Sequence, residues 1–243
     1  MSFLDDSAKL LLRKDPPGLE IAHYWRRTTS TLSDPSRRLL SYLVSALLSR
    51  GWLGAVENLL DAAADNLHES RAQVTAEFES LTALDLISVE AGKITQLAGL
   101  LSTKPTGITF KFDQHTEVHL LGPLAALAVS HALQKAGVVR AKCAADAGQK
   151  IELTCDLTGI ASRSPETVAL FLPAWDGEVS PAQAARGGGL FHSDEALDAW
   201  QQAQGSPLGM PIASMLFPMA AVDLGADLGS TLEAALNHLP DFS

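Results

Sequence analysis

The stretch RGGGLFHS, residues 186–193, has the residue types of a ligand site. Backbone amides in a glycine-rich segment that leads into a helix can bind an anion, and Arg186 would add a positive charge. The run lacks the G-x-x-x-x-G-K-[ST] spacing of a P-loop and the G-x-G-x-x-G spacing of a dinucleotide site. Two interpretations stay open: a ligand site with His192 as a candidate acid or base, and a flexible surface loop.

Three histidines form a second candidate group. His115 and His119 stand four residues apart in a segment predicted to begin a helix, and His131 follows twelve residues later. On a helix the first two would share a face and could bind a metal ion. No third ligand has a suitable spacing, because Glu117 would fall on another face. We therefore interpret these histidines as capping or surface residues, with His119 and His131 as candidates for polar ligand contacts.

Cys143 and Cys155 are the two cysteines of the chain, and they fall on strands predicted to be adjacent. Two neighbouring thiols can capture a soft metal, so these residues are the candidate metal ligands. The alternative is that both are small buried hydrophobic residues, which is the usual role of cysteine on a strand. No G-x-S-x-G, H-E-x-x-H or C-x-x-C motif occurs.

The composition limits the class of protein. The chain has 243 residues, is 47% hydrophobic and carries a net charge of −10 that is spread along the sequence. This charge argues against nucleic acid as the main partner, because phosphate backbones require clustered Lys and Arg. We see no membrane span and no secretion signal, and the cysteines are few. The sequence therefore predicts a cytoplasmic protein with reduced thiols.

The N-terminal half has the element pattern of a winged helix. A helix capped at residues 33–36 runs from about 37 to 50, and further helices are predicted at 54–64 and 69–84. Two short strands follow around Ala91-Gly92. The helix that would read DNA sets Arg71 against Glu69, Glu77 and Glu79, so a structural or protein-contact role is favoured. The basic stretches HYWRR and RRLL keep DNA binding open.

The second half reads as α+β. Residues 100–107 are predicted to be a linker, which divides the chain into residues 1–104 and 105–243. A strand at ITFKF precedes a largely apolar helix that includes Gly122-Pro123 in its first turns. Two strands joined near Ala147-Gly148, another strand at TVALFLPA, a helix capped by Ser193 and further helical segments complete the pattern.

The second half resembles the alkylmercury (organomercurial) lyase family. AGVVRAKCAADAGQKIELTCDLTGI (136–160) is similar to the family's strand pair, and the register continues back through FKFDQHTEVHLLGPLAALAVSHAL. RGGGLFHSDEALDAW and GMPIASMLFPMAAVDLG follow in the right order. The resemblance covers roughly residues 36–238 and implies an N-terminal winged-helix-like domain followed by a lyase-like α+β domain.

The resemblance also implies that the catalytic side chains are missing. The family uses two cysteine thiolates and one aspartate, and these fall on Gly122, on Ala185-Arg186-Gly187 and on Ala125. Cys143 matches a cysteine that the family uses structurally. Without a thiolate pair and a proton donor, carbon–mercury cleavage is not expected.

Two functions remain open. In the first, the old pocket binds or transforms an organic molecule without cysteine thiolates, and no particular cofactor is indicated. Its candidate contacts are Gly122, Ala125, His119, His131, Arg186, Gly187, Phe191 and His192. In the second, the chain is a ligand-sensing transcriptional regulator or an interaction protein. Residual mercury chemistry through Cys143 and Cys155 is a third, weaker alternative.

Overall fold

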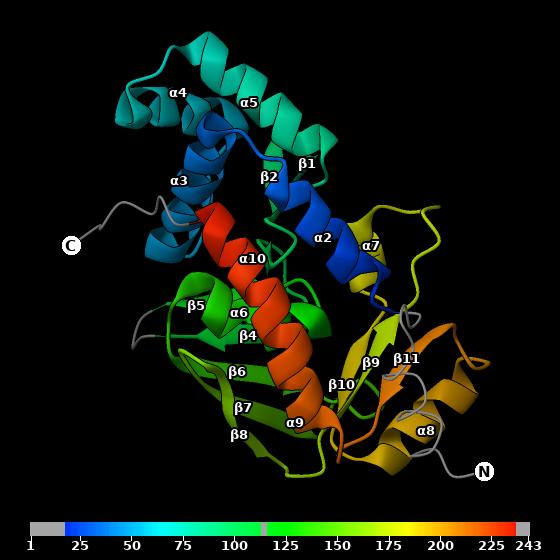
Figure 1. The fold of residues 1–243 in the computed structure, drawn as a ribbon. Coiled ribbons are helices and arrows are strands. Elements are labelled where there is room, and N and C mark those ends of the chain that lie inside the picture. Colours follow the sequence, from blue (N-terminus) through cyan, green and yellow to red (C-terminus); the bar gives the residue numbers. More distant parts are fainter. Residues whose placement is uncertain (1–17, 113–115, 237–243) are drawn as a thin grey trace.

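The computed structural model describes residues 18–112 and 116–236. The fold is α+β (Figure 1). The helices are α2 (Glu20–Ser30), α3 (Asp34–Arg50), α4 (Val56–Leu67), α5 (Arg71–Ala83), α6 (Pro123–Leu133), α7 (Pro181–Ala185), α8 (Asp194–Ala203), α9 (Phe217–Ala220), the π-helix η1 (Ala221–Gly225) and α10 (Ala226–Leu236). The strands are β1 (Ile87–Glu90), β2 (Lys93–Leu97), β3 (Leu101–Ser102), β4 (Ile108–Lys111), β5 (Glu117–Leu120), β6 (Gly137–Lys142), β7 (Lys150–Asp156), β8 (Gly159–Ser164), β9 (Ala169–Pro173), β10 (Gly189–Phe191) and β11 (Gly209–Ile212). Helices α3, α4 and α5 lie at one end of a large antiparallel sheet, and α2 lies beside α10 (Figure 1).

Helix α3 begins and ends at the residues that the sequence indicates, whereas α4 runs through the turn predicted at 65–68 and ends at Leu67. The Ser33 hydroxyl accepts a hydrogen bond from the Ser36 amide at the start of α3, and Gly51 ends this helix in a left-handed conformation. Ser70 and Gln73 form a capping box at the start of α5. The three helices and the β1–β2 hairpin thus occur in the predicted order, while their winged-helix character stays a prediction.

The charged side chains around α5 bond within the N-terminal region. Glu69 pairs with Arg38 at 2.6 Å, and Arg71 pairs with Asp61 at 2.6 Å. Glu77 accepts a hydrogen bond from Ser36 at the start of α3. These contacts join α5 to α3 and α4, as a structural role for this helix requires.

The segment 100–107 is only partly a linker. Leu100, Leu101 and Ser102 are buried, and β3 pairs with both β2 and β5. The N-terminal hairpin and the second half therefore share one eight-stranded sheet, in the order β1-β2-β3-β5-β4-β6-β7-β8. Lys104 and Pro105 are exposed, so the second part of the segment alone has the exposure of a linker.

One face of the sheet is covered by α6, which lies between the sheet and α10 (Figure 1). Along β7 the buried residues alternate with exposed ones, so that Ile151, Leu153 and Cys155 face the core. This period of two is the pattern of a strand with one buried face. The turn predicted near Ala147-Gly148 does join β6 and β7.

The glycine run leads into a second, three-stranded sheet, β10-β9-β11: Gly189 is the first residue of β10, whereas Gly187 lies in an exposed turn. Gly189 pairs with Phe171, and β10 is buried along its length. A Cβ at Gly188 would lie 2.5 Å from the Phe171 carbonyl oxygen. The glycines are therefore explained by close backbone packing, which the flexible-loop interpretation missed.

The predicted start of the apolar helix is wrong. Residues 117–120 form β5, in which Val118 and Leu120 are buried, and α6 begins only at Pro123 with Gly122 as its N-cap. Pro is suited to the first turn of a helix and fixes the boundary there. His119 consequently lies on a strand, and His115 is outside the described residues.

The C-terminal quarter also differs from the helical prediction. Gly209–Ile212 forms β11, whose Met210 and Ile212 are buried against β9. Pro211 is tolerated there because β11 is an edge strand. Helical structure begins at Phe217 and continues through α10. The sequence also gave no prediction of α2, whose Ile21 and Trp25 are buried.

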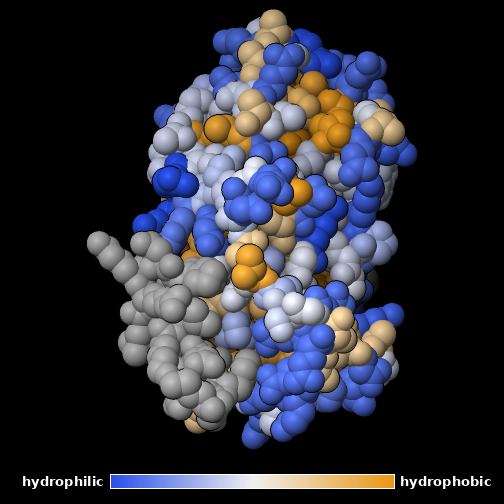
Figure 2. Space-filling view, turned by 90° about the vertical axis from the view of Figure 1, so that its right-hand side faces the viewer, coloured by the Kyte–Doolittle hydropathy of each residue, from blue (hydrophilic) through white to orange (hydrophobic). Residues whose placement is uncertain are grey.

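No helix among the described residues is long and apolar enough to cross a membrane. On the side of the molecule shown in Figure 2, the surface is mostly hydrophilic, and apolar side chains gather in several separate groups.

Candidate functional site

Gly122 and Arg186 meet where the N-terminus of α6 reaches the end of α7. A Cβ at position 122 would overlap the Ala185 carbonyl oxygen, so only glycine fits this approach. The two residues are 64 positions apart in the sequence, and the fold brings their chain segments together. At this contact the Ala185 backbone fills the space that a side chain at position 122 would need.

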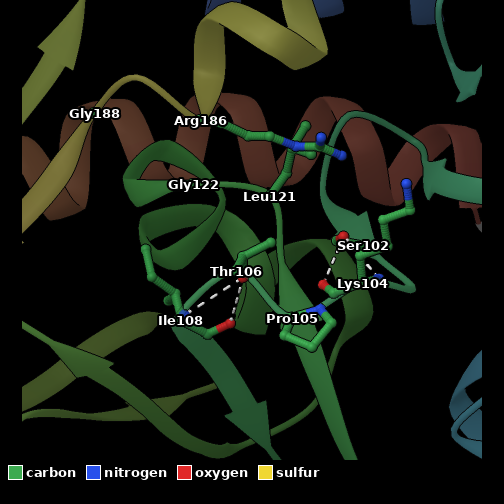
Figure 3. A pocket seen from close by; sticks show the side chains of 9 residues that line it. All are labelled: Ser102, Lys104, Pro105, Thr106, Ile108, Leu121, Gly122, Arg186 and Gly188. Carbon is green, nitrogen blue, oxygen red and sulfur yellow. Dashed lines mark hydrogen bonds between the residues drawn. The ribbon is translucent and has the colours of Figure 1, made fainter.

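A pocket of about 200 Å³ opens beside this contact (Figure 3). Its wall combines the segment before and within β4, the turn before α6 and the glycine run. The lining residues are Ser102, Lys104, Pro105, Thr106, Ile108, Leu121, Gly122, Arg186 and Gly188. Of the predicted ligand contacts, Gly122 and Arg186 therefore line one pocket together.

The hydroxyl groups of this pocket already have partners. Thr106 donates to the Leu120 carbonyl at 2.6 Å, and Ser102 donates to the Lys104 carbonyl at 2.9 Å. These bonds fix the segment 102–108, from which Lys104 projects (Figure 3). The pocket's remaining polar groups are charged side chains and the start of a helix.

Two cations and one carboxylate set the charge of the pocket. In Figure 3 the Lys104 and Arg186 side chains extend toward the same side of it. Lys104 pairs with Glu90 of β1, and the hydrogen bond and charge of Lys104 lower the pKa of Glu90, to which Arg186 adds a smaller effect. Arg186 forms no ion pair with any residue that the structure describes. The site therefore has one more positive than negative charge.

The N-terminus of α6 adds to this positive character. No side chain caps it, because its N-cap is Gly122. The first amides of a helix lack partners within the helix and carry part of the positive end of its dipole. The pocket therefore has the electrostatics of an anion site.

Neither cysteine lines this pocket. The Cys143 Sγ is buried and lies 3.3 Å from the His192 Nδ1, while Cys155 is buried beneath α6. Burial raises the pKa of the Cys155 thiol to about 11. A thiol in this state is a poor nucleophile and a poor metal ligand at neutral pH.

The two thiols are also far apart, contrary to the expectation from adjacent strands. Cys155 of β7 pairs with Gly137 of β6, whereas the Cys143 amide bonds to the Gln149 carbonyl. Gly137 and Cys143 are six residues apart, as are Gln149 and Cys155, so the two cysteines lie at opposite ends of the strand pair. At about 3.3 Å per residue, this corresponds to roughly 20 Å. The cysteines therefore cannot share a metal ion. Within the described ranges, no three His, Cys, Asp or Glu side chains are grouped to hold one.

The other predicted contacts lie elsewhere. His131 is at the far end of α6, where its Nε2 lies 2.9 Å from the Ser230 Oγ. Phe191 is fully buried against Trp200, and Ala125 is buried in α6. Gly187 packs beside Pro173 next to the pocket, and His192 is turned toward Cys143. His119 lines a different pocket on the other side of β4.

Sequence reasoning missed Lys104, Glu90 and Thr106. Lys104 and Thr106 fall in the predicted linker, and Glu90 falls in the N-terminal hairpin. No local motif links them, because only the pairing of β3 with β2 and β5 brings these segments together. These three residues could not be assigned to one site without knowing the order of the strands in the sheet.

No known protein-family model matches the sequence, and no curated protein matches it in sequence. Among solved structures, the crystal structure of the mercury-bound form of MerB2 is similar, with a TM-score of 0.66 and 19% sequence identity. The match covers 88% of this chain and 98% of that one. At this identity the similarity shows the fold alone: the chain has a MerB-like, alkylmercury-lyase-like architecture.

Proposed function

We propose that this chain binds a small organic anion in the pocket beside Gly122 and does not cleave carbon–mercury bonds. The observation that carries the proposal is the placement of Lys104 and Arg186 around the uncapped N-terminus of α6. The proposal therefore rests on the residues of the pocket and not on the similarity of fold.

The lining favours a carboxylate on a small apolar body. Arg186 can bind a carboxylate with two parallel hydrogen bonds, and the amides of a helix N-terminus favour the same charge. Leu121, Ile108 and Pro105 supply apolar surface for the rest of the molecule. The volume of about 200 Å³ limits the ligand to a small molecule, because a cavity of about 150 Å³ holds one benzene ring.

Three features oppose carbon–mercury cleavage. Position 122 has no space for a side chain, so a thiolate there would require the Ala185 backbone to move. The buried Ala125 side chain is a methyl group, which has no acidic proton to donate. Both cysteines are buried outside the pocket. The thiolates and the acid that this chemistry uses in the resembled family have no counterparts among the pocket residues.

Calorimetric titration with acetate, benzoate, succinate and malate tests the binding proposal. We expect saturable binding of at least one of these acids by the wild type, and a loss of at least tenfold in affinity in Arg186→Gln. Lys104→Gln should show a smaller loss, because Lys104 is already paired with Glu90. The control Arg50→Gln removes an exposed cation at the end of α3 and should bind as the wild type does.

Two results would count against the proposal. One is the absence of saturable binding of any of the four acids, and the other is unchanged affinity in Arg186→Gln. The lyase part is tested separately, by incubation with phenylmercury and excess thiol. Benzene release above the protein-free rate would overturn the claim that this chain does not cleave the bond.

A further inference from the structure

The sheet carries a second pocket on the side of β4 opposite the first. It has a volume of about 600 Å³ and lies over β4, β5, β6 and β7 and the turn between the last two. At the start of β4 the two pockets take alternate residues, since Ile108 lines the first and Thr109 the second, while Pro105 lines both. The charged residues of the second pocket are Arg140, Lys142, Lys150 and Glu152.

Two of its lysines face each other without an acidic partner. Lys142 and Lys150 are directly paired across β6 and β7, and both are exposed. Like charges in this arrangement destabilise a sheet. Neither lysine forms an ion pair with any residue in the described ranges. In the neighbouring pair across the same strands, Arg140 faces an opposite charge: its Nε lies 2.9 Å from the Glu152 Oε1.

The pocket is positively charged in a negatively charged protein. Its lining has three cations and one carboxylate, whereas the whole chain has a net charge of −10. His119 also lines it, and the Nδ1 of this ring has no hydrogen-bond partner. A ring rotation toward a ligand would therefore break no hydrogen bond at Nδ1. Thr109, which is paired with His119, already donates its hydroxyl to the Glu117 carboxylate at 2.6 Å, so its oxygen can only accept a further hydrogen bond.

We infer that this pocket binds a small organic phosphate, with Lys142 and Lys150 on the phosphate group. Side chains of directly opposed residues on one sheet face are close enough for both ammonium groups to meet one compact anion. A phosphate monoester supplies nearly two negative charges at neutral pH, which matches the two unpaired lysines. The rest of the pocket is large enough for the organic part of the molecule.

A charge reversal tests whether the two lysines bind phosphate or are paired without any function. Lys142→Glu creates an opposite-charge pair with Lys150, so the variant should fold with a free energy of unfolding equal to or above that of the wild type. Inorganic pyrophosphate and glycerol phosphate are the probes, titrated at low ionic strength. We expect the wild type to bind at least one of them, and Lys142→Glu to bind it at least tenfold more weakly.

Arg186→Gln is the matched control, because it removes a cation from the first pocket and should leave phosphate binding unchanged. Lys142→Glu should in turn leave the binding of organic acids unchanged, so the two proposals fail independently. The inference is overturned if the wild type binds neither probe or if Lys142→Glu keeps the wild-type affinity. It is also overturned if Arg186→Gln abolishes the binding, since the phosphate would then occupy the pocket beside Gly122.

Discussion

The two faces of the eight-stranded sheet use the same strands for different purposes. On the covered face, Leu153 and Cys155 of β7 are buried under α6, and Val139 of β6 is buried beside them. On the open face, Arg140, Lys142 and Lys150 are exposed. Alternate residues of one strand thus serve packing on one face and charge on the other. Substitutions of the buried residues of β6 and β7 should therefore change stability, and substitutions of the alternate, exposed residues should change binding.

The largest expected effect is on the covered face. Leu153→Ala removes a side chain that is fully buried and should lower the free energy of unfolding by about 2–5 kcal/mol. Thr154→Ala, one residue further and exposed, is the matched control and should change it by about 0.5 kcal/mol or less. Urea unfolding followed by circular dichroism measures both. Equal losses in the two variants would contradict the separation of the faces.

The next largest effect is a pH dependence of the free energy of unfolding, caused by the Cys155 thiol on the covered face. Burial raises the pKa of Cys155 from 9.0 to about 11, so the folded protein holds this proton more tightly than the unfolded chain. Stability from this group is present below pH 9 and is lost as the pH rises toward 11, by about 1.4 kcal/mol for each unit of pKa shift.

Cys155→Ala isolates this loss. Tyr24, whose pKa burial also raises, titrates in the wild type and the variant alike. The difference in free energy of unfolding between the two proteins should therefore shrink as the pH rises from 9 to 11, when both are measured in urea. A difference that stays constant over this range would show that the thiol titrates normally in the fold.

A smaller loss is expected at the start of α6, the helix that covers the sheet. Gly122→Ala places a methyl group against the Ala185 carbonyl and should cost about 1–3 kcal/mol of stability. Gly54→Ala is the control, since a methyl group there meets only Trp52 at an ordinary distance of 3.6 Å. If both variants unfold at the same urea concentration, the backbone around Gly122 adjusts freely, and the steric argument against a thiolate at this position is lost.

The ends of helices and the positions of turns could be predicted from the sequence where they depend on residues close together in the chain. Ser33 and Gly51 marked the ends of α3, and Ala91-Gly92 marked the hairpin turn, where both residues have positive φ. Short apolar segments were harder. EVHL was predicted as helix because it precedes an apolar helical run, but Pro123 stops the helix from extending backward and β5 finds partners in β3 and β4.

The sites were predicted only where the resemblance supplied a register. Gly122 and Arg186 were named together, and they line one pocket. His119 and His131 were assigned to the same pocket but lie on another face of the sheet and at the far end of α6. Lys104 and Lys142 had no recognisable pattern, since a cation becomes part of a site only through its neighbours in space.

The sequence by itself determined the α+β class, both ends of α3 and the turn that joins β6 and β7. These properties depend on residue type and on short spacings. The tertiary structure alone decided that the two cysteines lie apart, that the glycine run ends in a buried strand at Gly189, and that Lys104 joins Arg186 beside Gly122. Each of these depends on which strands pair, and pairing is fixed by burial over the whole chain.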